Sequence, residues 1–216
     1  MTTPVPRHGQ RVAAAGASLA GARAAMVLLH GRGAPAEDML GLAGELGMAD
    51  VAFLAPEADG FTWYPNTFLA PLERNEPWLS AALETVARVL EDVAGGGVPI
   101  ERTLLLGFSQ GACLATEFTA RNPRPFGGVI GLTGGLIGPP GTPRDYPGSL
   151  AGVPVFLGCS DVDPHIPLER VDETADVLGR MGATVDKRIY PGLPHTVNRD
   201  ELDAVRALVL AAADRA

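Results

Sequence analysis

Short apolar runs alternate along this chain with longer segments in which apolar residues recur every three or four positions. Six runs read as strands, at residues 24–30, 51–55, 103–108, 127–133, 153–157 and 184–190. Four segments have helical spacing, at residues 76–94, 110–121, 168–181 and 198–212. This alternation is typical of stacked βαβ units. The chain is therefore predicted to have an α/β fold, with a mainly parallel central sheet flanked by helices.

Composition excludes one class of binding partner and favours a single domain. The 216 residues carry 17 basic and 25 acidic side chains, so the formal net charge is −8, and 46% of residues are hydrophobic. Nucleic-acid binding draws most of its affinity from clustered Lys and Arg, so nucleic acid is excluded as the main partner. No linker-like stretch divides the chain. We expect a single domain over residues 1–216 without an inserted cap domain, in which residues 1–20 are irregular or form an edge strand.

Neither a targeting segment nor a metal site is evident. Residues 1–11 contain two prolines and two arginines but no apolar run, unlike a signal peptide. The longest apolar stretches, such as 24–29, are far shorter than the ~20 residues that cross a bilayer. Cys113 and Cys159 are too few for a disulfide scaffold, and no His-x-x-x-His or Cys-x-x-Cys pair suggests a metal. The prediction is a cytoplasmic protein with no membrane insertion, no metal, and two buried, reduced cysteines.

A Gly-Phe-Ser-Gln-Gly sequence at 107–111 lies between an expected strand and an expected helix. A nucleophilic Ser at the tip of such a strained turn needs glycine two residues to either side, because larger side chains would collide there. The free N–H groups that begin the helix also face the position of a developing oxyanion. Ser109 is therefore the candidate nucleophile. The alternative is a chance match in a chain with 27 glycines.

One of the four histidines stands where a general base is needed. His195 lies between the last expected strand and the last helix, at a strand end that follows both Ser109 and an acid at an earlier strand end. That is the Ser, Asp, His order of this type of sheet. Asp161 and Asp163 both follow the fifth expected strand. Asp163 is favoured as the acid that orients the imidazole, because it begins Asp-Pro-His-Ile-Pro, where the prolines stiffen the turn.

A tetrahedral intermediate also needs two donors for its oxyanion. The first expected strand ends in His-Gly-Arg-Gly at 30–33, where small residues let a backbone N–H approach the reacting oxygen. We assign the oxyanion hole to the backbone N–H groups of Arg32 and Gln110. An ordinary glycine-rich turn is the alternative. The Arg32 guanidinium is expected to be solvated rather than to meet an anionic substrate.

The most aromatic stretch of the chain, residues 60–69, follows the end of an expected strand. We interpret it as an apolar wall beside Ser109, and the loop at 134–152 is expected to supply the opposite wall. The predicted substrate-binding residues are Gly31, Trp63, Tyr64, Phe68, Leu136 and Ile137.

These motifs together resemble the carboxylesterase and phospholipase family of α/β hydrolases, which includes small bacterial carboxylesterases and acyl-protein thioesterases. The resemblance covers nearly the whole chain after the first twenty or so residues. It implies an α/β-hydrolase fold, no cofactor, and a small-molecule ester or thioester substrate. It also implies that Ser109 is the nucleophile, Asp163 the orienting acid and His195 the base. The chain departs from thioesterase-type members at 32–34, where it has Arg-Gly-Ala instead of Leu-Gly-Asp.

The predicted activity is hydrolysis of esters with a small or medium acyl chain through an acyl-enzyme. Within enzymes, the alternatives are a lysophospholipase or acyl-thioesterase, and a dienelactone-hydrolase-like activity, for which a Cys nucleophile is usual. Outside enzymes, the alternative is a non-catalytic binding protein with the same fold. The sequence leaves open the acyl length, the leaving group, the physiological substrate and the oligomeric state, with a homodimer as one alternative.

Overall fold

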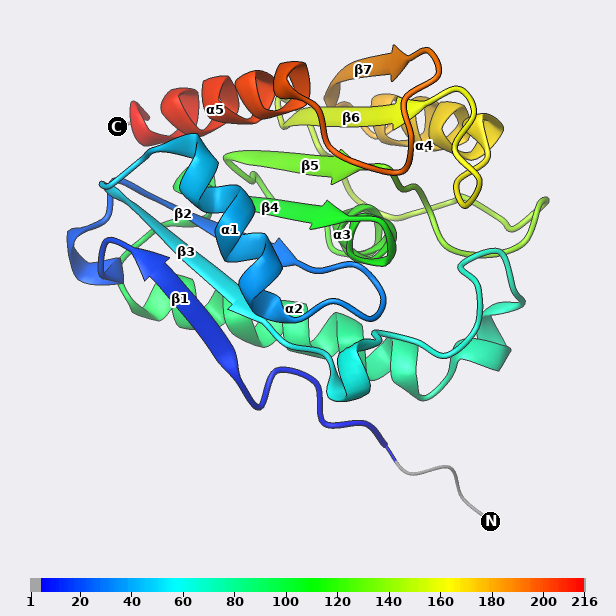
Figure 1. The fold of residues 1–216 in the computed structure, drawn as a ribbon, viewed down its shortest axis with the longest axis horizontal. Helices are drawn as coiled ribbons and strands as arrows, with labels where there is room; N and C mark the ends of the chain where they lie inside the picture. The colour runs from blue at the N-terminus through cyan, green and yellow to red at the C-terminus, as the bar shows by residue number, and fades with distance from the viewer. Residues whose placement is uncertain (1–4, 216) are drawn as a thin grey trace.

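A twisted seven-stranded sheet runs through the middle of the computed structural model, which describes residues 5–215 (Figure 1). The strand order is β1-β3-β2-β4-β5-β6-β7, and every neighbouring pair is parallel except β1 with β3. The strands are β1 (Val12–Gly16), β2 (Ala24–Leu29), β3 (Val51–Pro56), β4 (Thr103–Phe108), β5 (Gly128–Leu132), β6 (Pro154–Ser160) and β7 (Thr184–Tyr190). The prediction of a mainly parallel sheet is confirmed.

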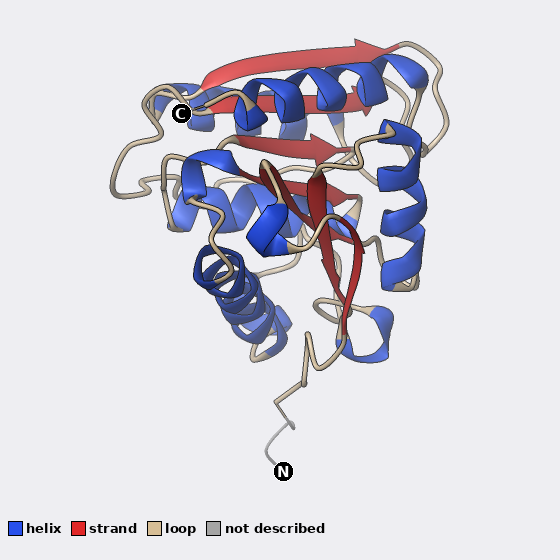
Figure 2. Ribbon diagram, turned by 90° about the vertical axis from the view of Figure 1, so that its left-hand side faces the viewer, coloured by secondary structure: helices blue, strands red, loops and turns tan. Residues whose placement is uncertain are grey.

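Five α-helices cover the two faces of the sheet (Figure 2). They are α1 (Ala36–Leu46), α2 (Trp78–Gly95), α3 (Gln110–Arg121), α4 (Leu168–Arg180) and α5 (Arg199–Ala213). One apolar cluster joins the sheet to α2, α3 and α4, and a second joins its other face to α1 and α5. No cap domain interrupts this arrangement between residues 5 and 215. No helix in that range is both long and apolar enough to cross a bilayer.

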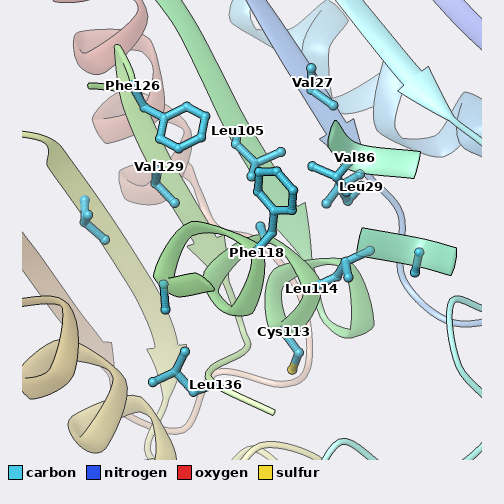
Figure 3. Packing of buried hydrophobic residues seen from close by; sticks show 14 of the residues in the cluster. Val27, Leu29, Val86, Leu105, Cys113, Leu114, Phe118, Phe126, Val129 and Leu136 are labelled. Atoms are coloured by element: carbon cyan, nitrogen blue, oxygen red, sulfur yellow. The ribbon is translucent and has the colours of Figure 1, made fainter. Parts of the chain in front are cut away.

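The core explains why the strands read as continuous apolar runs. All six residues of β2 are fully buried. Val27 and Leu29 pack with Leu105, Leu114 and other residues on the α2–α4 face (Figure 3). The alternate β2 residues join the cluster on the α1 and α5 face. Because both faces are covered by helices, the strand has no solvent side on which polar residues would be favoured.

Besides four short 3₁₀ helices, one α-helix and one strand lie outside the six expected strands and four expected helices. α1 was not predicted, because Gly41 and Gly44 weaken its helical propensity, although Met39 and Leu46 form its buried side. β1 forms an antiparallel edge, so the edge-strand alternative holds for residues 12–16. Residues 1–4 of the predicted N-terminal segment lie outside the described residues. The other elements begin and end within three residues of their predicted limits.

A buried carboxylate anchors the segment between β5 and β6 to the centre of the molecule. Residues 110–120 of α3 are all buried, so Glu117 has almost no contact with solvent. Its carboxylate accepts hydrogen bonds from Arg121 Nε at 2.7 Å, from the Ile137 backbone N–H at 2.9 Å and from the Tyr146 hydroxyl at 3.1 Å. Arg144, itself largely buried, lies 3.9 Å from the same carboxylate. The segment is therefore more firmly held than the surface loop that its Pro and Gly content suggests.

Glu117→Ala is expected to lower the free energy of unfolding by about 3–5 kcal/mol, because it leaves the buried Ile137 N–H and the Tyr146 hydroxyl without their acceptor and removes the carboxylate beside the Arg144 guanidinium. Urea denaturation followed by far-UV circular dichroism measures the change. Glu84→Ala, at an exposed position of α2, is the control and should shift stability by less than about 0.5 kcal/mol. A Glu117→Ala protein as stable as the control would contradict this account of the segment.

A second buried carboxylate makes stability depend on pH. Glu201 in the first turn of α5 is fully buried behind Gly158 of β6, and it accepts a hydrogen bond from the Asn198 backbone N–H at 2.8 Å. Desolvation raises the pKa of Glu201 to about 7. The folded state therefore favours the protonated acid, and the corresponding stability is present at low pH and is lost as pH rises through about 7.

Glu201→Gln is expected to flatten this pH dependence, because the amide resembles the protonated acid and does not ionise. The loss between about pH 5 and about pH 8 should be on the order of 3 kcal/mol in the unchanged protein. Urea unfolding at several pH values measures it. Asp203→Asn, an exposed position on the same helix, should retain the unchanged protein's slope. Equal slopes for Glu201→Gln and the unchanged protein would show that Glu201 does not cause the effect.

Candidate active site

Three side chains from separate loops meet at the carboxyl edge of the sheet. Ser109 follows β4, Asp163 follows β6 and His195 follows β7. His195 Nε2 lies 2.9 Å from Ser109 Oγ, and His195 Nδ1 lies 2.7 Å from Asp163 Oδ2. The imidazole therefore lies between a hydroxyl and a carboxylate, each within hydrogen-bond distance. This is the geometry that activates a hydroxyl for attack on a carbonyl.

The turn at Ser109 is strained, and close packing of the chain around it requires glycine. Ser109 has φ 54° and ψ −117°, and its N–H donates to Leu132 O of β5 at 3.0 Å. A Cβ at Gly107 would collide with the backbone of Gly111, and a Cβ at Gly111 would collide with the backbone of Leu29. The two glycines let strand and helix approach closely enough to project the hydroxyl from the tip of the turn.

The two candidate acids have different partners. The Asp163 carboxylate is shielded from solvent and also accepts hydrogen bonds from the N–H groups of His165 and Ile166, at 2.8 and 3.0 Å. Burial opposes its ionisation, but the hydrogen bonds from His195 and from these N–H groups outweigh burial, so the pKa of Asp163 is lowered. Asp161 Oδ1 instead accepts from the Gly192 N–H at 2.8 Å. Asp161 thus fastens the loop that carries His195 and does not touch the imidazole.

Two of the other histidines are buried structural residues. His30 Nε2 accepts from the Ala58 N–H at 3.0 Å, and Nδ1 lies 2.8 Å from Gly31 O, so the proton is on Nδ1. Burial lowers the pKa of His30. His8 packs against the ring of Trp63 and accepts from a backbone N–H through Nδ1. Although its neighbours in sequence are polar, His8 is only 4% exposed.

His165 lies beside the site, although sequence reasoning gave it no role. Its ring stands edge-on to the ring of His195, with 4.8 Å between the centroids, and it lines the pocket in front of Ser109. The available signal was its place in Asp-Pro-His-Ile-Pro, two residues after Asp163. The same turn that aims the Asp163 carboxylate therefore also places a second imidazole at the pocket.

A pocket of about 500 Å³ opens in front of Ser109. Of the predicted substrate-binding residues, Gly31, Tyr64 and Phe68 line it. Cys113, one helical turn after Ser109 on α3, lines it as well and was not predicted to do so. Burial raises the pKa of the Cys113 thiol to about 12, so the thiol stays protonated near neutral pH. Cys113 and Cys159 are both buried and free.

The structure places the other three predicted substrate-binding residues in the core, so their assignment to the pocket walls is corrected. Trp63 is fully buried, and its indole N–H donates to His30 O at 2.9 Å. Leu136 and Ile137 are also fully buried. The Leu136 N–H donates to Thr174 Oγ1 of α4 at 2.9 Å, and neither Leu136 nor Ile137 lines the pocket. Aromatic and apolar content suggested pocket walls here, but it did not indicate which residues of these segments face the pocket and which pack in the core.

Arg32 and Gln110, the residues predicted to supply the oxyanion donors, both line the pocket. Gln110 begins α3, so its backbone N–H has no carbonyl one helical turn earlier to bond. From the sequence we expected the Arg32 side chain to be solvated, but in the structure it is bound to a neighbouring segment. Its guanidinium donates to Thr62 Oγ1 at 3.0 Å and to Asn66 O at 2.6 Å. Within residues 5–215, no three His, Cys, Asp or Glu side chains cluster as a metal site would require.

Comparison with known proteins shows which family this chain is similar to. A phospholipase/carboxylesterase family model matches residues 14–211. A crystal structure of a phospholipase/carboxylesterase from Dyadobacter fermentans is 40% identical, with a TM-score of 0.89, over 94% of this chain and 97% of that one. The crystal structure of esterase PE8 is 25% identical, with a TM-score of 0.75, over 96% of this chain and 99% of that one.

A curated relative, acyl-protein thioesterase 1 of Gibberella zeae, is 30% identical over 126 residues, which make up 56% of this chain and 52% of that protein. The chain thus spans about half the length of the curated relatives it matches. The family model, in contrast, covers the sheet from β1 to β7 and most of α5. The chain belongs to the phospholipase/carboxylesterase family of α/β hydrolases.

Proposed function

We propose that this protein hydrolyses carboxylic esters with a small or medium acyl chain through an acyl-enzyme on Ser109. The observation that carries the proposal is the position of His195, 2.9 Å from the Ser109 hydroxyl and 2.7 Å from the Asp163 carboxylate. An ionised Asp163 accepts the Nδ1–H of His195 and holds the tautomer in which Nε2 is free to accept a proton. The lowered pKa of Asp163 supports its being ionised near neutral pH.

In the proposed reaction, Ser109 Oγ attacks the ester carbonyl while His195 Nε2 takes the hydroxyl proton. The tetrahedral oxyanion accepts hydrogen bonds from the backbone N–H groups of Arg32 and Gln110. His195 then gives the proton to the leaving alcohol as its C–O bond breaks, which leaves Ser109 acylated. A water molecule, deprotonated by His195, attacks the acyl carbonyl, and the released Ser109 oxygen recovers the proton.

The volume and the lining of the pocket support a substrate with an uncharged acyl group of small or medium length. The pocket's 500 Å³ are lined by Phe68, Tyr64 and Ile166 beside Ser109. Thioester hydrolysis is the second candidate, because curated relatives are named acyl-protein thioesterases. The same attack and the same oxyanion hole serve a thioester, whose thiolate is a better leaving group. We further propose that the chain acts as one domain, which the continuous sheet supports. The cytoplasmic location stays a prediction from the sequence.

Two measurements test the proposed function. A panel of p-nitrophenyl esters from acetate to laurate, with matching thioesters, should give the highest kcat/KM at short or medium acyl length. A fluorophosphonate probe should label Ser109 in the folded protein, since it reacts with an activated serine. Absence of both turnover and labelling would favour the non-catalytic binding protein. Turnover of long acyl chains alone would favour a lysophospholipase.

A further inference from the structure

Residues 62–66, of which the last three line the pocket, are held by two side chains from distant parts of the chain. We call this segment the rim loop. Gln110 is 6% exposed, and its side-chain amide pairs with the rim loop much as a neighbouring strand would. Gln110 Oε1 accepts from the Trp63 N–H at 3.0 Å, while Nε2 donates to Tyr64 O at 2.8 Å. The amide thus satisfies a buried donor and a buried acceptor of the loop backbone.

Arg32 holds the same loop from the solvent side. Its Nη1 donates to Thr62 Oγ1 at 3.0 Å and to Pro65 O at 3.1 Å, and its Nη2 donates to Asn66 O at 2.6 Å. The planar guanidinium can reach all three acceptors at once, which the single ammonium of a lysine cannot do. Three N–H groups of Arg32 are thus engaged with the rim loop.

Arg32 and Gln110 are also the two residues whose backbone N–H groups we assign to the oxyanion hole. Each therefore has its backbone at the reacting centre and its side chain on the rim loop. We propose that Arg32 and Gln110 are positioning residues whose side chains, by binding the rim loop, fix the spacing and direction of the two oxyanion donors. This inference rests on the proposed ester hydrolysis.

The physical reason is that the oxyanion hole tolerates little displacement. Loss of one oxyanion donor costs about 10²–10³ in kcat in a related type of site. A misplacement of about 1 Å can cost about 10² in rate. His30 and Gly31, at the start of the turn after β2, are buried, and the Trp63 indole N–H fixes His30 O at 2.9 Å, whereas Arg32 and Gly33 are exposed. The exposed half of the turn is tied to other segments by the Arg32 guanidinium and by the Gly33 N–H, which lies 2.7 Å from Phe61 O. Tethering at the rim loop therefore limits the freedom of the Arg32 backbone.

Gln110→Glu tests the tether through its pH dependence. An ionised carboxylate still accepts from the Trp63 N–H, but it repels Tyr64 O, whereas a protonated carboxyl can donate to that oxygen. We expect kcat for p-nitrophenyl acetate near pH 8 to fall by about 10–100-fold with KM changed by less than about threefold, because oxyanion contacts form mainly in the transition state. As the pH falls toward about 5.5 and the carboxylate becomes protonated, the kcat of Gln110→Glu relative to that of the unchanged protein should rise.

Arg32→Met, on an exposed side chain, provides a variant that should fold. It is expected to lower kcat by about tenfold, and Arg32→Lys by an intermediate amount, because the ammonium binds only part of the loop. Arg23→Met is the matched control. Arg23 precedes β2 at the opposite edge of the sheet and pairs with Asp50 and Asp214, so its removal should leave kcat unchanged. All assays are run well below the melting temperature measured for each variant.

The outcomes separate this inference from the proposed function. Suppose that the unchanged protein hydrolyses the ester and that kcat of Arg32→Met and Gln110→Glu lies within about twofold of its value. This result would overturn the positioning role of the two side chains but not the proposed hydrolysis. Full recovery in Arg32→Lys would show that charge, and not the forked binding of the loop, is what matters, and would also overturn it. Absence of turnover in the unchanged protein would overturn both proposals.

Discussion

Ser109→Ala is expected to lower kcat for p-nitrophenyl acetate by about 10⁴-fold or more, by analogy with other serine triads. Only the hydroxyl oxygen of Ser109 can form the acyl bond. It lies 2.9 Å from His195 Nε2, which would take the hydroxyl proton. Without this hydroxyl, the remaining reaction is slow attack by water on the carbonyl of an ester bound in the oxyanion hole. Initial rates at saturating substrate, together with loss of fluorophosphonate labelling, measure the effect.

The control for this prediction is Ser80→Ala, at an exposed position in α2, which should keep the rate and the labelling of the unchanged protein. The Ser109→Ala side chain is smaller than the one it replaces, and the positive φ of this turn is unchanged by the substitution, so the fold should persist. If Ser109→Ala hydrolyses the ester as fast as the unchanged protein, the mechanism is wrong.

Asp163→Asn is expected to lower kcat by about 10⁴-fold, as happens when the orienting carboxylate of a serine triad becomes an amide. The asparagine can donate to His195 Nδ1, which would favour the tautomer with the proton on Nε2, and Nε2 could then no longer accept the Ser109 proton. The variant also lacks the negative charge that stabilises the imidazolium. Steady-state kinetics over a range of pH values provide the measurement.

Asp161→Asn is the matched comparison, because Asp161 is the other acid that follows β6. Its Oδ1 accepts from the Gly192 N–H at 2.8 Å, and an asparagine oxygen can accept the same bond. The loop that bears His195 should therefore stay in place, and kcat should stay within about threefold of the unchanged protein. A large loss in Asp161→Asn with little loss in Asp163→Asn would exchange the roles of the two residues.

Much of the fold was predictable because its signals are local. A strand that is covered on both faces must be apolar along its whole length, as β2 is, and a helix on the sheet must repeat its apolar residues every three or four positions. α1 escaped detection because Gly41 and Gly44 interrupt this signal, and packing against β3 and α5 outweighs their low helical propensity.

The sequence by itself indicated Ser109, Asp163 and His195, since each lies at a strand end and parallel strands bring their carboxyl ends to one edge. The tertiary structure decided which apolar side chains reach the pocket, because Tyr64 and Trp63 are adjacent in sequence yet differ in the neighbours that surround them. It also decided what the side chains of Arg32 and Gln110 do. Their partners in the rim loop lie 30 to 48 residues away in the chain, so only the folded backbone brings them within hydrogen-bond distance.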